Sequence, residues 1–222
     1  MNSTDKKTNK ISALILRLLY IFIRVTAALP GLLWMRPRIL YENEAARRRI
    51  RGGALLVSNH VSVLDPVYVM FTVWYRQIRF VCLKEFFDGG FRSLIFRISR
   101  CIPIDRENVG VDTLREIVSA LKAEEAVAIF PEGHIKESDE AVDSFKSGAV
   151  LMSVMSGRPI VPVYIQKSKR FFSRLTAVVG EPMDPAAAYG KRPTGEQLRA
   201  FSEAMHGREL ELAARCNRKE TK

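Results

Sequence analysis

Short apolar runs that alternate with helix-length segments constrain the fold of this 222-residue chain more than any other feature. Each run has five to seven residues, which is typical of a buried strand. Strands that alternate with helices predict an α/β fold with a mixed, partly parallel sheet flanked by helices. We expect strands at 54–58, 78–82, 101–105, 126–130, 159–165 and 174–180.

The intervening segments carry the helical pattern. The clearest helix is 112–122, where four apolar residues recur at helical spacing and Asp112 is placed to cap the start. The segment 182–193 has a proline at each end and is expected to be a loop. Further helices are expected at 66–76, 85–98, 145–156 and 195–214.

The composition indicates one sizeable core with an appendage, because 47% of the 222 residues are apolar. Cys82, Cys101 and Cys216 form no Cys-x-x-Cys pair, so neither a disulfide framework nor a zinc site is expected. The three histidines are not spaced as metal ligands, and we expect no metal. Such cysteine usage fits reducing, cytosol-facing surroundings.

The net charge of +11 is concentrated at the N-terminus. Residues 1–51 contain 11 Lys or Arg against three Asp or Glu, a net of +8. A basic excess can serve nucleic acid or an anionic membrane face. The accompanying residues favour the membrane, because 11–35 is far too apolar for an arm that binds nucleic acid.

The segment 1–38 is therefore predicted to be an amphipathic helical membrane foot, with the remaining domain at 39–222. Lys10, Arg17 and Arg24 recur every seven residues, so they share one side of a helix whose other residues are apolar. Such a helix lies in the headgroup layer, on the cytoplasmic face, and each arginine makes spanning unfavourable by about 2.5–3.5 kcal/mol. Pro30-Gly31 should break it. A cleaved signal peptide and a helix packed on the core remain alternatives.

His60 and Asp65 are the strongest candidates for chemistry. His60 follows the predicted strand 54–58, and a carboxylate five positions on can orient it as a general base. On a regular helix the two side chains would point apart, so they meet only if the backbone bends between them. The alternative is structural: Asp65 caps a helix with Pro66 at its first position, and His60 is a loop histidine.

Four motifs follow one another along the chain: Asn59-His60 with Asp65, Ile102 to Arg106, Ile129 to Gly133, and Ile160 to Val163. Together they resemble the glycerolipid acyltransferases typified by 1-acylglycerol-3-phosphate O-acyltransferase. The resemblance covers roughly residues 50–180, with Lys84-Glu85-Phe86 and Phe145 to Gly148 as further agreeing pieces. Each motif is common, but four at the family's spacing are specific.

The resemblance implies acyl transfer from acyl-CoA or acyl-carrier protein to the hydroxyl of a lysophosphatidate-type acceptor, in phospholipid biosynthesis. A thioester is already activated, so His60 as base with Asp65 as its partner is sufficient, without a cofactor. Backbone N–H groups at Glu132-Gly133 are candidate oxyanion donors. Arg106 and Lys84 are the candidate ligands for the acceptor phosphate.

One departure from the family's pattern concerns the acceptor. The family continues its third motif with Glu-Gly-Thr-Arg, whose arginine binds the acceptor phosphate, whereas this chain has Ile135 at that position. Lys136 or His134 could substitute from a neighbouring position. A different lysolipid acceptor is therefore an open alternative. So is a non-catalytic membrane-binding protein that retains the fold, although His60 and Asp65 are both present.

Overall fold

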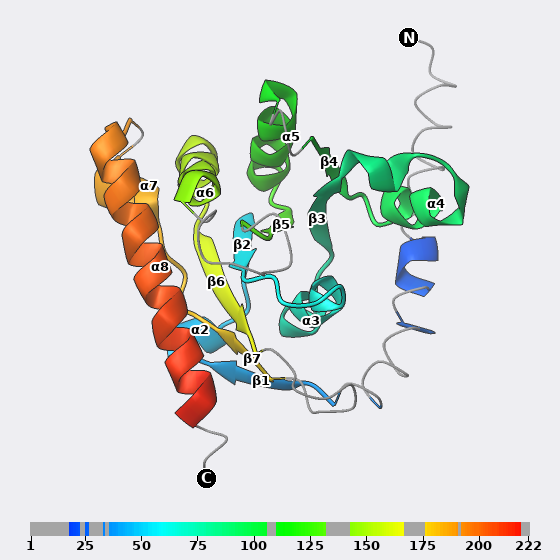
Figure 1. The fold of residues 1–222 in the computed structure, drawn as a ribbon, viewed down its shortest axis with the longest axis horizontal. Helices are drawn as coiled ribbons and strands as arrows, with labels where there is room; N and C mark the ends of the chain where they lie inside the picture. The colour runs from blue at the N-terminus through cyan, green and yellow to red at the C-terminus, as the bar shows by residue number, and fades with distance from the viewer. Residues whose placement is uncertain are drawn as a thin grey trace.

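The computed structural model describes residues 18–22, 25–26, 33, 36–105, 110–131, 143–166, 176–190 and 192–218. Within these ranges the chain forms a seven-stranded sheet flanked by helices, so the predicted α/β class is confirmed (Figure 1). Most of the predicted membrane foot lies outside the described residues, and it stays a prediction. The strands are β1 (Arg38–Tyr41), β2 (Ala54–Ser58), β3 (Ile78–Leu83), β4 (Ile102–Ile104), β5 (Ala126–Ile129), β6 (Ile160–Ile165) and β7 (Thr176–Val179).

The sheet is mixed and mostly parallel, with the order β1-β7-β6-β2-β5-β3-β4. Strands β6, β2, β5, β3 and β4 all run in one direction. β7 pairs antiparallel with β6, and β1 pairs parallel with β7, so the two strands at this end of the sheet run the opposite way. The six predicted strands are all present, and β1 is the strand that the sequence pattern did not indicate.

Helical structure is present at each predicted helix, but the details differ in several places and α2 was not predicted. The segment predicted as a loop contains α7, which Asp184 caps by accepting a hydrogen bond from the Ala187 N–H at 3.0 Å. Asp112 does not cap its helix: the capping residue is Gly110, and Asp112 pairs on the surface with Arg115. The helical elements are α2 (Glu44–Arg47), α3 (Asp65–Thr72), the 3₁₀ helix η1 (Lys84–Phe87), α4 (Gly90–Ile98), α5 (Val111–Lys122), α6 (Asp143–Ser156), α7 (Pro185–Tyr189) and α8 (Gly195–Arg218).

The expected helix over 85–98 is divided into η1 and α4 by a turn at Asp88-Gly89. Gly89 and Gly90 have φ angles of 73° and 72°, in the left-handed region where an L side chain is strained. The glycines therefore redirect the chain and start a new helix. The propensity of the flanking residues alone did not reveal this break.

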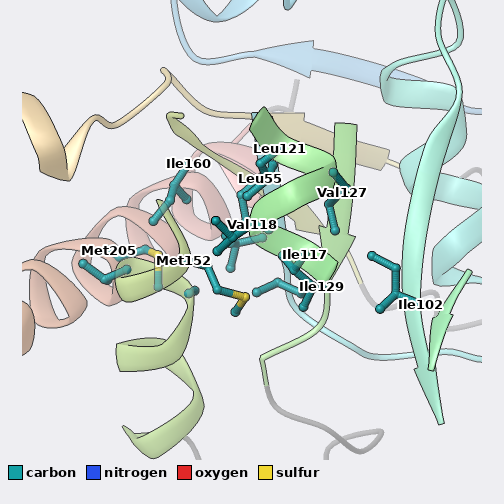
Figure 2. Close-up of a cluster of buried hydrophobic side chains, with 14 of the residues drawn as sticks. Leu55, Ile102, Ile117, Val118, Leu121, Val127, Ile129, Met152, Ile160 and Met205 are labelled. Atoms are coloured by element: carbon teal, nitrogen blue, oxygen red, sulfur yellow. The ribbon is translucent and has the colours of Figure 1, made fainter. Parts of the chain in front are cut away.

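The sheet is buried on both faces, and β2 at its centre has five buried residues. Its side chains alternate: Ala54 and Leu56 join a cluster with Val69 and Val73 from the α3 side, whereas Leu55 and Val57 join the other cluster. Figure 2 shows this second cluster, in which α5, α6 and α8 cover the strands through side chains such as Val118, Met152 and Met205. An all-apolar run is therefore the expected sequence for β2.

Among the residues that the structure describes, none of the helices is long and apolar enough to cross a bilayer.

The loop before β2 approaches α5 so closely that it has no room for a side chain. A Cβ added at Gly53 would collide with the backbone carbonyl of Leu121 at the end of α5. We expect Gly53→Ala to lower the free energy of unfolding by about 1–3 kcal/mol, because backbone must move. Urea denaturation of the purified protein measures this change.

Gly207→Ala is the matched control for that substitution. Gly207 lies inside α8, and a Cβ there meets nothing within 4 Å. Alanine at this position should raise the free energy of unfolding by about 0.5–1 kcal/mol, since it restricts the unfolded chain. Equal effects of the two alanines would contradict the close approach at Gly53.

Candidate active site

The candidate catalytic residues lie at the carboxyl edge of the parallel strands. His60 follows β2, Lys84 follows β3, Asp105 follows β4 and Phe130 follows β5. Because these strands run in the same direction, the segments that follow them leave the sheet at one edge. In open α/β sheets this edge is where ligands bind.

The loop between β2 and α3 brings His60 and Asp65 together. The Nδ1 atom of His60 lies 2.7 Å from Oδ2 of Asp65. The same oxygen accepts the backbone N–H groups of Val61 and Ser62 at 2.6 and 2.7 Å. The backbone thus bends around the carboxylate. This bend is what residues five positions apart need for their side chains to meet.

The alternative structural role for Asp65 is wrong, although Pro66 does lie in the first turn of α3. The residue at the cap position of α3 is Leu64, which makes no side-chain cap. The carboxylate of Asp65 instead points back over the loop and binds two of its N–H groups. It serves the loop that carries the histidine rather than its own helix.

The carboxylate of Asp65 is fully buried, and its Oδ1 finds no hydrogen-bond donor among the described residues. Its hydrogen bonds therefore all fall on Oδ2. Tyr68 lies one turn further along α3, and its pKa is raised, mainly by burial and secondly by the negative charge of Asp65. The negative charge of Asp65 therefore acts on Tyr68 as well as on His60.

The hydrogen bonds of Asp65 fix the tautomer of His60. Oδ2 of Asp65 already accepts hydrogen bonds from two backbone N–H groups. Nδ1 of the imidazole is therefore the donor in the hydrogen bond between the two side chains. In the neutral ring, the lone pair then resides on Nε2. The His60 side chain is 20% exposed, so it remains accessible to a small reactant. Such a pair can act as a general base toward a hydroxyl.

Phe130 supports the imidazole from one side, a role that the sequence did not assign. The rings of His60 and Phe130 stack with their centroids 4.6 Å apart, and Phe80 stacks on Phe130 at 6.4 Å. Aromatic contacts of this kind are worth about 0.5–1.5 kcal/mol. Phe130 directly follows β5 and His60 lies just after β2, so the segment after the neighbouring strand limits the rotation of the ring.

Asn59 ties the histidine loop to β6. Its buried side-chain amide donates to the carbonyl of Ile165 at 2.8 Å and accepts the N–H of Ile165 at 2.7 Å. The side chain thereby continues the β2–β6 ladder by one step where the backbone of β2 has already turned away. A buried amide with both partners satisfied resists displacement, so the loop has a fixed origin. A polar residue directly after an apolar strand was the available signal in the sequence.

Lys84 is engaged with another side chain at the same edge. Its Nζ lies 2.5 Å from Oδ2 of Asp105, so the pair joins the carboxyl ends of β3 and β4. An incoming anion must compete with this carboxylate for the ammonium group. The role of Lys84 in binding substrate stays a prediction.

The other predicted binding residues, Arg106, Glu132, Gly133 and Lys136, lie outside the described residues, as does Ile135. Their roles stay predictions. In the part of the chain that is described, no group of three or more His, Cys, Asp or Glu could hold a metal ion. No disulfide joins Cys82, Cys101 and Cys216.

The chain is similar in sequence to several known proteins. The family model described as "Acyltransferase" matches residues 38–166, more than half of the chain. A 1-acyl-sn-glycerol-3-phosphate acyltransferase of Bacillus subtilis is 28% identical over 72% of this chain and 81% of its own. One from Streptococcus pneumoniae is 29% identical over 66% of this chain, and the match spans 54% of that protein. An N-acylphosphatidylethanolamine synthase of Arabidopsis thaliana is 28% identical over 54% of this chain and 45% of its own.

Among solved structures, the chain is similar to the 1-acyl-sn-glycerophosphate (LPA) acyltransferase of Thermotoga maritima. The two superpose with a TM-score of 0.60 over 92% of this chain and 96% of that one. Their sequences are 19% identical, so this likeness shows the fold.

The buried carboxylate should be essential to the stability of the loop. We expect Asp65→Asn to lower the free energy of unfolding by about 1.5–3 kcal/mol, because charge-assisted hydrogen bonds to an inaccessible oxygen are lost. Asp112→Asn changes an exposed carboxylate with one surface partner and should stay within about 0.5 kcal/mol. Urea denaturation compares the two, and equal effects would contradict the assigned role of Asp65.

Proposed function

The chain belongs to the acyltransferase family, and on that basis we propose that it transfers a fatty acyl group from a thioester to the hydroxyl of a lysophosphatidate-type acceptor. The donor is acyl-CoA or acyl-carrier protein, and the product is a phospholipid precursor. The observation that carries the proposal is the His60–Asp65 pair, accessible at the carboxyl edge of the sheet. The names of the bacterial relatives support the acceptor class.

His60 acts as the general base in this proposal. Nε2 takes the proton of the acceptor hydroxyl, and the oxygen attacks the thioester carbonyl. Asp65 stabilises the imidazolium that forms, because its oxygen already accepts Nδ1–H. The tetrahedral intermediate collapses with loss of the thiolate, which takes the proton back from the imidazolium. The enzyme returns to its starting state without a covalent acyl intermediate and without a cofactor.

The remaining predicted residues bind the acceptor and the developing charge. Glu132 and Gly133 follow β5 in the sequence and would supply backbone N–H groups to the oxyanion. Arg106 follows β4, and its planar guanidinium suits a phosphate group. Lys84 and Lys136 complete the cationic side of the site, with Lys84 shared between Asp105 and the phosphate.

A second acceptor class is favoured by one specific observation. Isoleucine stands at position 135, where the family's pattern has a phosphate-binding arginine. An isoleucine offers no hydrogen bond, so the acceptor headgroup is held differently from the family's usual one. A different lysolipid is the alternative substrate. A plant relative named as an N-acylphosphatidylethanolamine synthase supports variation of the acceptor between related proteins.

We also propose that the protein works at an anionic membrane surface, on its cytoplasmic face, with the N-terminal foot as its principal contact. Three described residues of that segment support this placement, because Leu18, Ile21 and Phe22 are helical and 46–63% exposed, whereas Tyr20 beside them is buried. Apolar side chains on a cationic helix are suited to the headgroup layer. The competing hypothesis is that the protein retains the fold and binds membranes but does not catalyse acyl transfer. An activity assay separates the two hypotheses.

The His60 assignment is tested by release of free thiol. Purified protein with an acyl thioester and a panel of lysolipids, lysophosphatidate first, should release thiol at a measurable rate. His60→Ala should lower kcat by about 10²–10⁴, the usual contribution of a positioned base. His206→Ala is the matched control, since His206 is a half-exposed histidine on α8.

Full activity of the His60 variant would show that another group is the base. No thiol release by the wild-type protein with any acceptor would favour the non-catalytic hypothesis. The acceptor that gives the highest kcat/KM identifies the headgroup that the site with Ile135 accepts.

Deletion of residues 1–35 tests the foot and leaves β1 complete, because that strand begins at Arg38. We expect the fraction that co-sediments with anionic vesicles to fall by at least about tenfold, while the circular dichroism of the α/β body is retained. A truncated protein that binds as tightly as the full chain would place the principal contact elsewhere.

A further inference from the structure

The helix α4 exposes an apolar stripe that no described element covers. Phe91, Leu94 and Ile95 lie at i, i+3 and i+4 and share one face of the helix. Their exposed fractions are 78%, 49% and 38%. Large apolar side chains grouped in this way mark an interaction surface rather than scattered surface residues.

The opposite face of α4 binds the body of the protein. Ser93 is buried, and Phe96 packs on the sheet with its ring 5.1 Å from that of Phe86. Ile98, at the end of the helix, is only 4% exposed. Along the stripe itself the exposed fraction falls from 78% at Phe91 to 38% at Ile95, so the amino end of the stripe stands out furthest from the protein.

Two arginines flank the apolar stripe. At about 100° per residue, Arg92 lies on one side of Phe91 and Arg97 on the other. Neither forms an ion pair within the described part of the chain: Arg92 lies over the Phe86 ring at 5.1 Å, and Arg97 bonds to the Ser93 hydroxyl at 3.2 Å. The helix contains no Asp or Glu. An apolar stripe between two cations is complementary to an anionic lipid surface, with the arginines at headgroup level.

The stripe also lies on the side of the protein where a lipid must arrive. α4 follows β3 and η1 and so extends from the carboxyl edge that carries His60. Phe96 of α4 and Phe130, on which His60 stacks, pack against the same core cluster. Val63, between His60 and Asp65, is a further exposed apolar side chain at this edge.

We propose that α4 is a second membrane-contacting element, which inserts its amino end into the headgroup layer of an anionic bilayer and faces the candidate site toward the lipid. The proposal rests on the proposed function in one respect: the site needs to face the bilayer only if the substrate is a lipid. Its contact with the bilayer is a separate property. The foot holds the protein at the surface, and α4 sets its orientation there.

The test is a polarity-sensitive fluorophore attached at position 91 of the full-length chain. Phe91→Cys and Leu210→Cys are labelled separately, because Leu210 is an exposed apolar residue on α8, with 59% exposure, that lies outside the stripe. Wild-type protein taken through the same labelling measures the contribution of the three native cysteines. We expect vesicles of phosphatidylcholine with phosphatidylglycerol to shift the emission at 91 to the blue and to leave that at 210 unchanged.

The outcomes separate the possible occupants of the stripe. Identical responses at the two positions would overturn the proposal. Emission at 91 that is already blue without vesicles would also overturn it, because protein, either residues 1–35 or a second copy, would then cover the stripe. This measurement needs no turnover, so its failure is distinct from failure of the proposed activity.

A second variant links the contact to catalysis. Phe91→Ser, Leu94→Ser and Ile95→Ser together should lower the rate with a vesicle-embedded acceptor by about tenfold. The rate with a short-chain acceptor that stays dispersed in water should be unchanged, since none of the three residues belongs to the site. The same ratio of variant rate to wild-type rate with both acceptors would overturn the orienting role. If the wild-type protein shows no activity with either acceptor, that result would count against the proposed function instead.

Discussion

The hydrogen bonds made by one oxygen of the buried Asp65 carboxylate hold the candidate site in shape. Oδ2 accepts two backbone N–H groups of the loop and Nδ1 of His60, within 2.7 Å in each case. A fully buried carboxylate is costly unless it is compensated, so the loop must close around it. Closing the loop fixes both the position and the tautomer of the imidazole. The same interaction is therefore structural and chemical at once.

Three contacts with the surrounding fold hold the histidine and the carboxylate in place. Asn59 fastens the start of the loop to β6, Phe130 from β5 stacks on the imidazole, and α3 carries the carboxylate. β2 lies between β5 and β6 in the sheet, so each support comes from an adjacent element. A central strand of a parallel sheet is suited to carry a base because its neighbours constrain the residue that follows it.

Two features relate this site to a lipid substrate. The histidine and the projecting stripe of α4 both extend from the carboxyl edge of the sheet. A substrate with its headgroup at the site and its chain in the bilayer would meet both. If the proposed function is correct, catalysis depends on orientation at the surface as much as on the base, because the rest of the lipid would hold the reacting hydroxyl at a fixed depth.

The sequence by itself determined the α/β class, six strands, the major helices and the identity of the His60–Asp65 pair, because burial on both faces forces apolar runs and a titratable pair stands out after one of them. It missed β1, since four half-buried residues carry no periodic signal, and the break at Gly89-Gly90. Only the tertiary structure decided that Asp65 turns toward the loop, that Asn59 and Phe130 brace the histidine, and that Phe91 projects from the surface. The contacts of Asn59 and Phe130 bring together segments that follow different strands, and no local pattern records which distant segments the sheet order makes neighbours.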